Sequence, residues 1–281
     1  MDKCFRIWNL FQNSSNEIRT KALLIGINYL DRLSKYRSIR NIGNILKMKE
    51  FITTRKYFLP DDITTMTDDL DYDDKLYPTT KNIIAKLNDL LIFANDCPDK
   101  NKIFIVYSGH TVGITGSEDE KPSTTQALVT TDGIVSRYDF HDNFINKLSE
   151  LTTVFVIVDS YNIQPFCELK YRHNYENGYT YTVVDTSIPT DCTCIILNAC
   201  KYNDYLLNLL NDENIGEYNN NALIDAFLGI YNENISVRNL TYGIKQWFQK
   251  NNLKQVPHIS SSSLIYINRV VIGSLFKTDN K

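Results

Sequence analysis

The sequence predicts a single α/β domain whose mostly parallel central sheet is covered by helices on both faces. Two runs of apolar, mostly β-branched or aromatic residues, 103–107 and 154–158, have the length and composition of buried parallel strands. Strand-like and helix-like segments alternate along the chain, as in doubly wound sheets. Apolar residues make up 43% of the 281 residues, which is enough for a substantial core.

The first half of the chain predicts three strands and two helices. The apolar run over 22–27 predicts a buried strand, and apolar residues at helical spacing predict a helix over 41–53. Residues 63–66 form a second, short strand. Thr80 is a favourable N-cap for a helix with a wide apolar face. The run over 103–107 is then the third strand.

The second half continues the alternation of strands and helices. We expect, in order, a hairpin over 126–135 that turns at Asp132-Gly133, a helix over 138–148, strands over 154–158 and 193–197, helices over 221–231 and 237–250, and a terminal strand over 263–272. Polar composition predicts loops over 112–125 and 170–180 and a linker over 206–219.

Composition and charge exclude several classes of partner. A formal net charge of −3, with both signs interleaved, offers no surface for nucleic acid. No apolar run has the length of a transmembrane helix, and the apolar patch within 1–13 is too short and polar for a signal peptide. The cysteines lack metal-binding spacing, so we predict reduced thiols, no metal or other cofactor, and an intracellular, cytoplasmic protein. They are Cys4, Cys97, Cys167, Cys192, Cys194 and Cys200.

Two of the predicted central strands end at residues with functional chemistry. His110 follows the strand over 103–107, and Asp159, Ser160 and Tyr161 follow the strand over 154–158. In open α/β sheets, ligands bind beyond the carboxyl ends of the strands, so these residues are expected at one edge of the sheet. His110 is a candidate general base, and a hydrogen-bonded structural histidine is the competing interpretation.

These residues carry a resemblance to a known family. Residues 107–110, Tyr-Ser-Gly-His, resemble the Tyr/Phe-Ser-Gly-His motif of metacaspases, which are caspase-like cysteine peptidases. Residues 159–161, Asp-Ser-Tyr, resemble the family's Asp-Ser-Cys segment, with Tyr161 at the position of the catalytic cysteine. Further segments resemble the family in the same order along the chain: 21–29, 66–69 with 78–79, 198–200 with 221–228, and 255–262.

The resemblance implies a caspase-like three-layer α/β/α sandwich over residues 1–281. It divides the domain into a surface segment over 1–20, a large-subunit-like part over 21–200 and a small-subunit-like part over 201–281. It makes His110 and Tyr161 the vestigial positions of a catalytic dyad. It also assigns positions to the substrate pocket, namely Asn44, Asp159, Cys200 and Tyr202.

Tyr161 leads us to predict that the chain is not an enzyme. A cysteine peptidase needs a thiolate held by an imidazole, and a free phenol ionises near pH 10 rather than 8.5. The ring also fills the space of the scissile carbonyl. Thr111 stands where the family usually has glycine, which adds bulk beside the expected oxyanion hole.

The pocket and the metal site of the family are also altered. Asn44 and Tyr202 stand where the resemblance implies pocket acids, so a desolvated guanidinium would find no counter-charge. Many metacaspases bind calcium through an Asp-Asp pair, whereas this chain has Arg137-Tyr138 and only Asp139. We therefore expect calcium independence.

The leading hypothesis is a metacaspase-like pseudopeptidase that acts by binding a protein partner or a peptide in the old cleft. The chain would then be a structural or regulatory component. Its Asn-, Ile- and Lys-rich composition suits an AT-rich genome such as that of a giant virus, and in that case the protein would be associated with the virion. An active hydrolase that uses Ser160 or Cys167 with His110 is the alternative. A phosphate binder is disfavoured, because only Gly26 follows the first strand.

Overall fold

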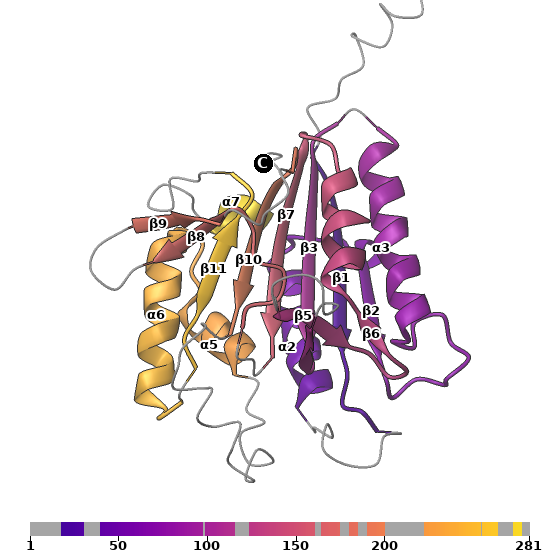
Figure 1. The fold of residues 1–281 in the computed structure, drawn as a ribbon, viewed down its shortest axis with the longest axis horizontal. Coiled ribbons are helices and arrows are strands. Elements are labelled where there is room, and N and C mark those ends of the chain that lie inside the picture. The colour runs from indigo at the N-terminus through magenta and orange to yellow at the C-terminus, as the bar shows by residue number, and fades with distance from the viewer. Residues whose placement is uncertain are drawn as a thin grey trace, which may run out of the picture.

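The structure is a computed structural model, and it describes residues 18–30, 40–97, 99–115, 124–160, 164–174, 180–184, 190–199, 222–253, 255–263 and 272–276. Within these residues, the central sheet has eight strands in the order β2-β1-β3-β7-β10-β11-β8-β9 (Figure 1). Their bounds, in chain order, are β1 Arg19–Gly26, β2 Ile63–Thr67, β3 Asn101–Ser108, β7 Thr152–Asp159, β8 Tyr171–Asn174, β9 Thr180–Val183, β10 Thr193–Asn198 and β11 His258–Ser261.

The predicted fold class is confirmed. Strands β2, β1, β3, β7 and β10 run parallel, and β11, β8 and β9 continue the sheet antiparallel. The sheet is therefore mostly parallel, and helices cover both of its faces. The helices are α2 Asn41–Thr54, α3 Thr80–Asn95, α5 Leu223–Ile230, α6 Val237–Lys250 and α7 Ile272–Phe276.

The two faces of the sheet build two separate hydrophobic clusters. Along the central strands, alternate side chains point to opposite faces, as the pleat requires. Phe104 and Val106 of β3 join the cluster made with α2, α5, α6 and α7. Ile103 and Ile105 join the cluster made with α3 and the segment 140–148. Burial on both faces is the reason these strands read as continuous apolar runs.

Several element predictions are wrong. Residues 112–125 were predicted as a loop, but β4 (Thr111–Thr115) and β5 (Thr124–Val129) pair there, and β6 (Ile134–Val135) completes a small antiparallel sheet. The predicted loop over 170–180 contains β8 and the start of β9. The expected helix over 138–148 is a π-helix, η2 (Tyr138–Asp142), and a 3-10 turn, η3 (Ile145–Lys147). The N-cap of α3 is Thr79, whose hydroxyl accepts the Asn82 amide, rather than Thr80.

Some predictions fall outside the described residues. These are residues 1–17 of the expected surface segment, the linker over 206–219 and 264–271 of the expected terminal strand. Strand β11 ends at Ser261, and α7 begins at Ile272. Among the residues that the structure describes, no helix is both long and apolar enough to cross a bilayer.

Candidate functional site

His110 lies at the carboxyl edge of the central sheet, just beyond β3. The Gly109 amide donates to the Asp159 carbonyl over 3.2 Å, so the chain leaving β3 stays beside the end of β7. The backbone amide of His110 donates to the Tyr29 hydroxyl over 2.8 Å. Its carbonyl accepts from the Tyr107 hydroxyl over 2.6 Å and from the Val129 amide over 2.9 Å. The backbone of His110 is therefore held on both sides.

The side chain of His110 is partly buried, and its ring centroid lies 5.1 Å from that of Tyr29. Gly109 makes this approach possible. A Cβ atom at Gly109 would clash with the Tyr107 hydroxyl and would stand 2.9 Å from that of Tyr29. Only glycine therefore leaves room for both hydroxyls beneath the loop that presents His110.

Ser160 lies next to this loop. Its hydroxyl is 3.3 Å from the hydroxyl of Thr111, and the residue is 2% exposed. Tyr161, the position that the resemblance assigns to the nucleophile, lies outside the described residues. In the alternative hydrolase, in which Ser160 is the nucleophile, the Ser160 hydroxyl would therefore lie beside the residue that follows His110.

Cys167 is poorly suited to be a nucleophile. It is 2% exposed and belongs to the hydrophobic cluster that contains Phe166. Burial raises the pKa of its thiol to about 12. Because the thiolate is the reactive form, a thiol in this environment is inert at neutral pH.

Asn44 and Asp159, two of the expected pocket positions, are both buried and form a hydrogen bond with each other. Asn44 Nδ2 donates to Asp159 Oδ2 over 3.1 Å, and the Leu223 amide donates to Oδ1 over 3.0 Å. Asp159 is fully buried, and this burial raises its pKa to about 7, although the hydrogen bonds act in the opposite direction. The carboxylate thus joins β7 to α2 and to the first turn of α5, and both of its oxygens are engaged within the protein.

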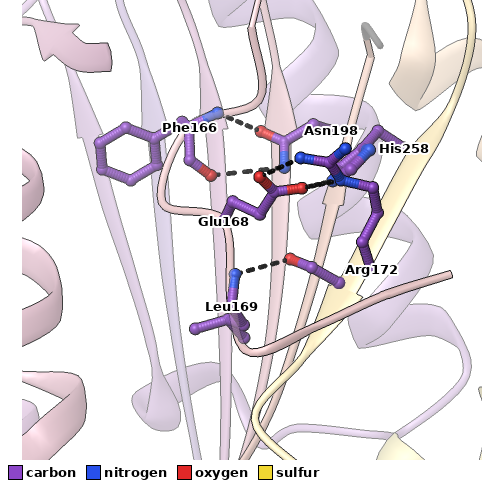
Figure 2. A network of polar contacts seen from close by, with 7 residues as sticks. Phe166, Glu168, Leu169, Arg172, Asn198 and His258 are labelled. Atoms are coloured by element: carbon purple, nitrogen blue, oxygen red, sulfur yellow. Dashed lines mark hydrogen bonds and ion pairs between the residues drawn. The ribbon is translucent and has the colours of Figure 1, made fainter. Parts of the chain in front are cut away.

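Cys200 and Tyr202, the other expected pocket positions, lie outside the described residues. The segment that follows position 161 is described from Gln164, and polar contacts attach it to the sheet (Figure 2). The Asn198 side chain bonds both backbone groups of Phe166, over 3.1 Å and 3.4 Å. The Leu169 amide donates to the Ser260 hydroxyl over 3.2 Å.

Glu168 is the centre of the same network. Figure 2 shows Arg172 and His258 on one side of its carboxylate. The guanidinium of Arg172 makes a bidentate ion pair with it, and His258 Nε2 lies 3.3 Å from Oε1. Burial would raise the pKa of Glu168, but the contacts with His258 and Arg172 outweigh it and lower that pKa to about 2. This network holds the segment after position 161 against β8, β10 and β11.

The residues around Asp139 do not fit a calcium site. The Asp139 carboxylate accepts the amide and the hydroxyl of Ser136, over 3.0 Å and 2.6 Å. Its neighbours are Arg137 and Tyr138, neither of which offers an anionic oxygen. Calcium requires six to eight oxygen ligands. Across the described ranges, no three His, Cys, Asp or Glu side chains converge in a way that would hold a metal ion.

Sequence reasoning missed Tyr29, Asn198 and the Glu168–Arg172–His258 network. Tyr29, Asn198 and His258 lie inside segments that carry the resemblance, but nothing local predicts their contacts, because each acts through a partner distant along the chain. Glu168 and Arg172 are four residues apart, and their pairing was not predicted. Tyr107 was inside the quoted motif, but its role as a hydrogen-bond donor to His110 was not predicted.

Comparison with known proteins identifies the relatives of this chain. A model of the family described as Metacaspase, peptidase C14 domain, matches residues 20–169. Metacaspase-1 of Eremothecium gossypii is 27% identical over 169 residues, which are 58% of this chain and 36% of the relative. Metacaspase-9 of Arabidopsis thaliana is 31% identical over 141 residues, 50% of this chain and 42% of the relative. The chain thus spans about two fifths of the length of these relatives.

Among solved structures, protein GSU0716 from Geobacter sulfurreducens is similar in fold, with a TM-score of 0.58 at 14% sequence identity. The match covers 91% of this chain and 98% of that chain. The match to a peptidase family, and relatives that are named metacaspases, contradict the prediction that the chain is not an enzyme. The prediction was drawn from Tyr161 together with Thr111 and the altered pocket and calcium positions, and substitutions at single positions do not define what a whole site does.

Proposed function

This chain belongs to the metacaspase family of peptidase C14 domains, and on that premise we propose that it binds extended polypeptide beside His110. The observation that carries the proposal is the presentation of His110 at the carboxyl edge of the sheet, with its backbone held by Tyr29 and Tyr107. Ligand sites of open α/β sheets lie at this edge. The partner is a protein segment or a peptide, and binding it gives the chain a structural or regulatory role.

Peptide binding tests this proposal directly. A library of fluorescent decapeptides, varied at one central position, would be titrated with the full chain and followed by anisotropy. We expect a subset to bind, and His110→Ala to weaken that subset about tenfold or more, which corresponds to about 1.4 kcal/mol. The control is Asn95→Ala, on α3, whose side chain contacts the Lys147 carbonyl and not the site. No binding by any peptide, or equal binding by His110→Ala, contradicts the proposal.

A second candidate is hydrolysis by Ser160 and His110. The observation that favours it is the Ser160 hydroxyl beside Thr111, the residue after His110. In such a reaction the Ser160 oxygen bonds to the peptide carbonyl carbon, and His110 takes the hydroxyl proton. The C–N bond then breaks as His110 passes that proton to the leaving amine. Water releases the acyl group in a second step.

Labelling and product analysis separate hydrolysis from binding alone. A fluorophosphonate probe would label Ser160 in the wild type and lose that label in Ser160→Ala, as read by peptide mass spectrometry. The bound library peptides would be cleaved by the wild type and stay intact with His110→Ala. Intact peptides and an unlabelled Ser160 would exclude this candidate and leave the binding proposal standing.

A further inference from the structure

Tyr29 and Tyr107 form a buried hydroxyl pair directly beneath His110. Tyr107 is in β3, and Tyr29 lies in the segment that follows β1. Each is 1% exposed, and their hydroxyl oxygens are 3.0 Å apart. Both are also within 2.9 Å of the Val129 carbonyl, in β5. The pair thus joins the end of the central sheet to the small antiparallel sheet, with His110 between them.

In one arrangement of the hydrogen atoms that the distances allow, each tyrosine bonds a different backbone group of His110. The Tyr29 oxygen accepts the His110 amide hydrogen, so its own hydrogen is available for the Val129 carbonyl. Tyr107 then gives its hydrogen to the His110 carbonyl. Burial, followed by the proximity of Tyr29, raises the pKa of Tyr107, so this donor keeps its proton. In this arrangement the His110 amide donates to Tyr29, and the His110 carbonyl accepts from Tyr107 as well as from the Val129 amide.

The backbone of Tyr29 is itself held in an unusual conformation. Its φ is +58°, in the left-handed region that bulky residues rarely adopt. The Asp68 carboxylate fixes the residues on both sides, because it accepts the Asn28 amide over 2.7 Å and the Leu30 amide over 2.9 Å. Such a conformation persists only where neighbouring contacts impose it. Here the residue held in this conformation, Tyr29, contacts both the backbone and the ring of His110.

We propose that Tyr29 and Tyr107 are positioning residues, which set the place and orientation of the His110 imidazole through its backbone. This inference rests on the proposed function, in which His110 contacts the bound polypeptide. It extends that function by naming the groups that act on His110 without touching the ligand themselves.

A second buried tyrosine pair provides a matched control. The hydroxyls of Tyr57 and Tyr231 are 2.7 Å apart, and the residues are 5% and 7% exposed. They belong to the hydrophobic cluster on the opposite face of the sheet from Tyr29 and Tyr107. Removing a hydroxyl from this pair costs a buried hydrogen bond of the same kind, at a distance from His110.

The experiment compares Tyr29→Phe, Tyr107→Phe and Tyr57→Phe in the full chain. Two readouts are used: anisotropy with the library peptides, and the pH titration of the His110 ring, followed by NMR among the four imidazoles of the chain. We expect Tyr29→Phe and Tyr107→Phe each to weaken peptide binding about fivefold to tenfold and to shift the His110 titration. Tyr57→Phe should lose comparable thermal stability with both readouts unchanged.

The two readouts separate this inference from the proposed function. If the wild type binds no peptide, the proposed function fails, while the His110 titration still tests the positioning role. If Tyr29→Phe and Tyr107→Phe leave the titration and the affinity as in the wild type, the positioning role is wrong. Equal losses in Tyr57→Phe would also overturn it, because the effect would then follow stability. Should one variant fail to fold, the other decides.

Discussion

Asp159 and Glu168 are two buried carboxylates with opposite behaviour. Asp159 is fully buried, and its carboxylate accepts from neutral donors, which are the Leu223 and Ile224 amides and the Asn44 side chain. Burial raises its pKa to about 7. The side chain of Glu168 is 19% exposed and faces Arg172 and His258. Burial acts on it in the same direction, but these partners lower its pKa to about 2.

The comparison shows that neutral hydrogen bonds stabilise a buried carboxylate less than partners of opposite charge do. Amide dipoles at the start of α5 stabilise the ionised form of Asp159, but they do not replace the hydration that it lost. Around Glu168, a guanidinium and an imidazole compensate for the lost hydration, since they add opposite charge to the hydrogen bonds. Asp159 therefore changes protonation near neutral pH, whereas Glu168 stays ionised. The following predictions test or refine this difference, from the largest effect to the smallest.

The largest effect is expected for Asp159→Asn, which should remove a pH dependence of the free energy of unfolding. A folded pKa raised from 3.8 to about 7 gives stability that is complete below pH 3.8 and is lost as the pH rises through 7. Asparagine resembles the protonated acid and does not titrate. Between about pH 5 and pH 8, the free energy of unfolding of the variant should therefore rise relative to the wild type by about 3 kcal/mol.

Urea denaturation at several pH values measures this change. The control is Asp89→Asn on α3, whose carboxylate is 60% exposed and paired with Lys86. It should follow the wild type in parallel across the range. A constant difference between Asp159→Asn and the wild type would show that Asp159 has an ordinary pKa.

Asn44→Asp is expected to destabilise the protein at neutral pH by about 2 kcal/mol. The new carboxylate would stand 3.1 Å from Asp159, where the amide now donates. Two like charges this close cannot both ionise, so the pair should share one proton and the loss should shrink near pH 5. Denaturation at both pH values checks this, and equal losses at both would contradict the proximity of the two groups.

Glu168→Gln is expected to show a pH trend opposite to that of Asp159→Asn, with an effect similar in size to that of Asn44→Asp. A folded pKa lowered from 4.5 to about 2 gives stability that is present above pH 4.5 and is lost as the pH falls toward 2. The destabilisation by the variant should therefore decrease by about 2 kcal/mol between about pH 6 and pH 3. A deficit that does not vary with pH would mean that Arg172 and His258 do not hold the ionised form.

The smallest effect is expected for Glu233→Gln, which separates burial from charge pairing. Glu233 also faces a guanidinium, that of Arg55 at 3.8 Å, but its side chain is 45% exposed. Exposed pairs contribute little, so the free energy of unfolding should change by less than about 1 kcal/mol. A loss as large as that of Glu168→Gln would show that burial is not what distinguishes the two glutamates.

Local pattern was sufficient for the elements with buried faces. The strands that became β1, β3, β7 and β10 are apolar on both faces, and a run of that kind is visible within the chain itself. Helix α6 was expected over 237–250 and has these bounds, because one of its faces is apolar at helical spacing and Ser236 caps it.

The sequence by itself therefore determined the α/β class, the central strands and the position of His110 at the end of one of them. Strands β4, β8 and β9 were decided by tertiary structure, since they are short and polar and form only by pairing with other strands. The same holds for the tyrosines beneath His110, the donors around Asp159 and the cations around Glu168. Hydrophobic burial leaves a periodic pattern along the chain, whereas a hydrogen bond or ion pair between distant residues exists only once the fold has brought its two partners together.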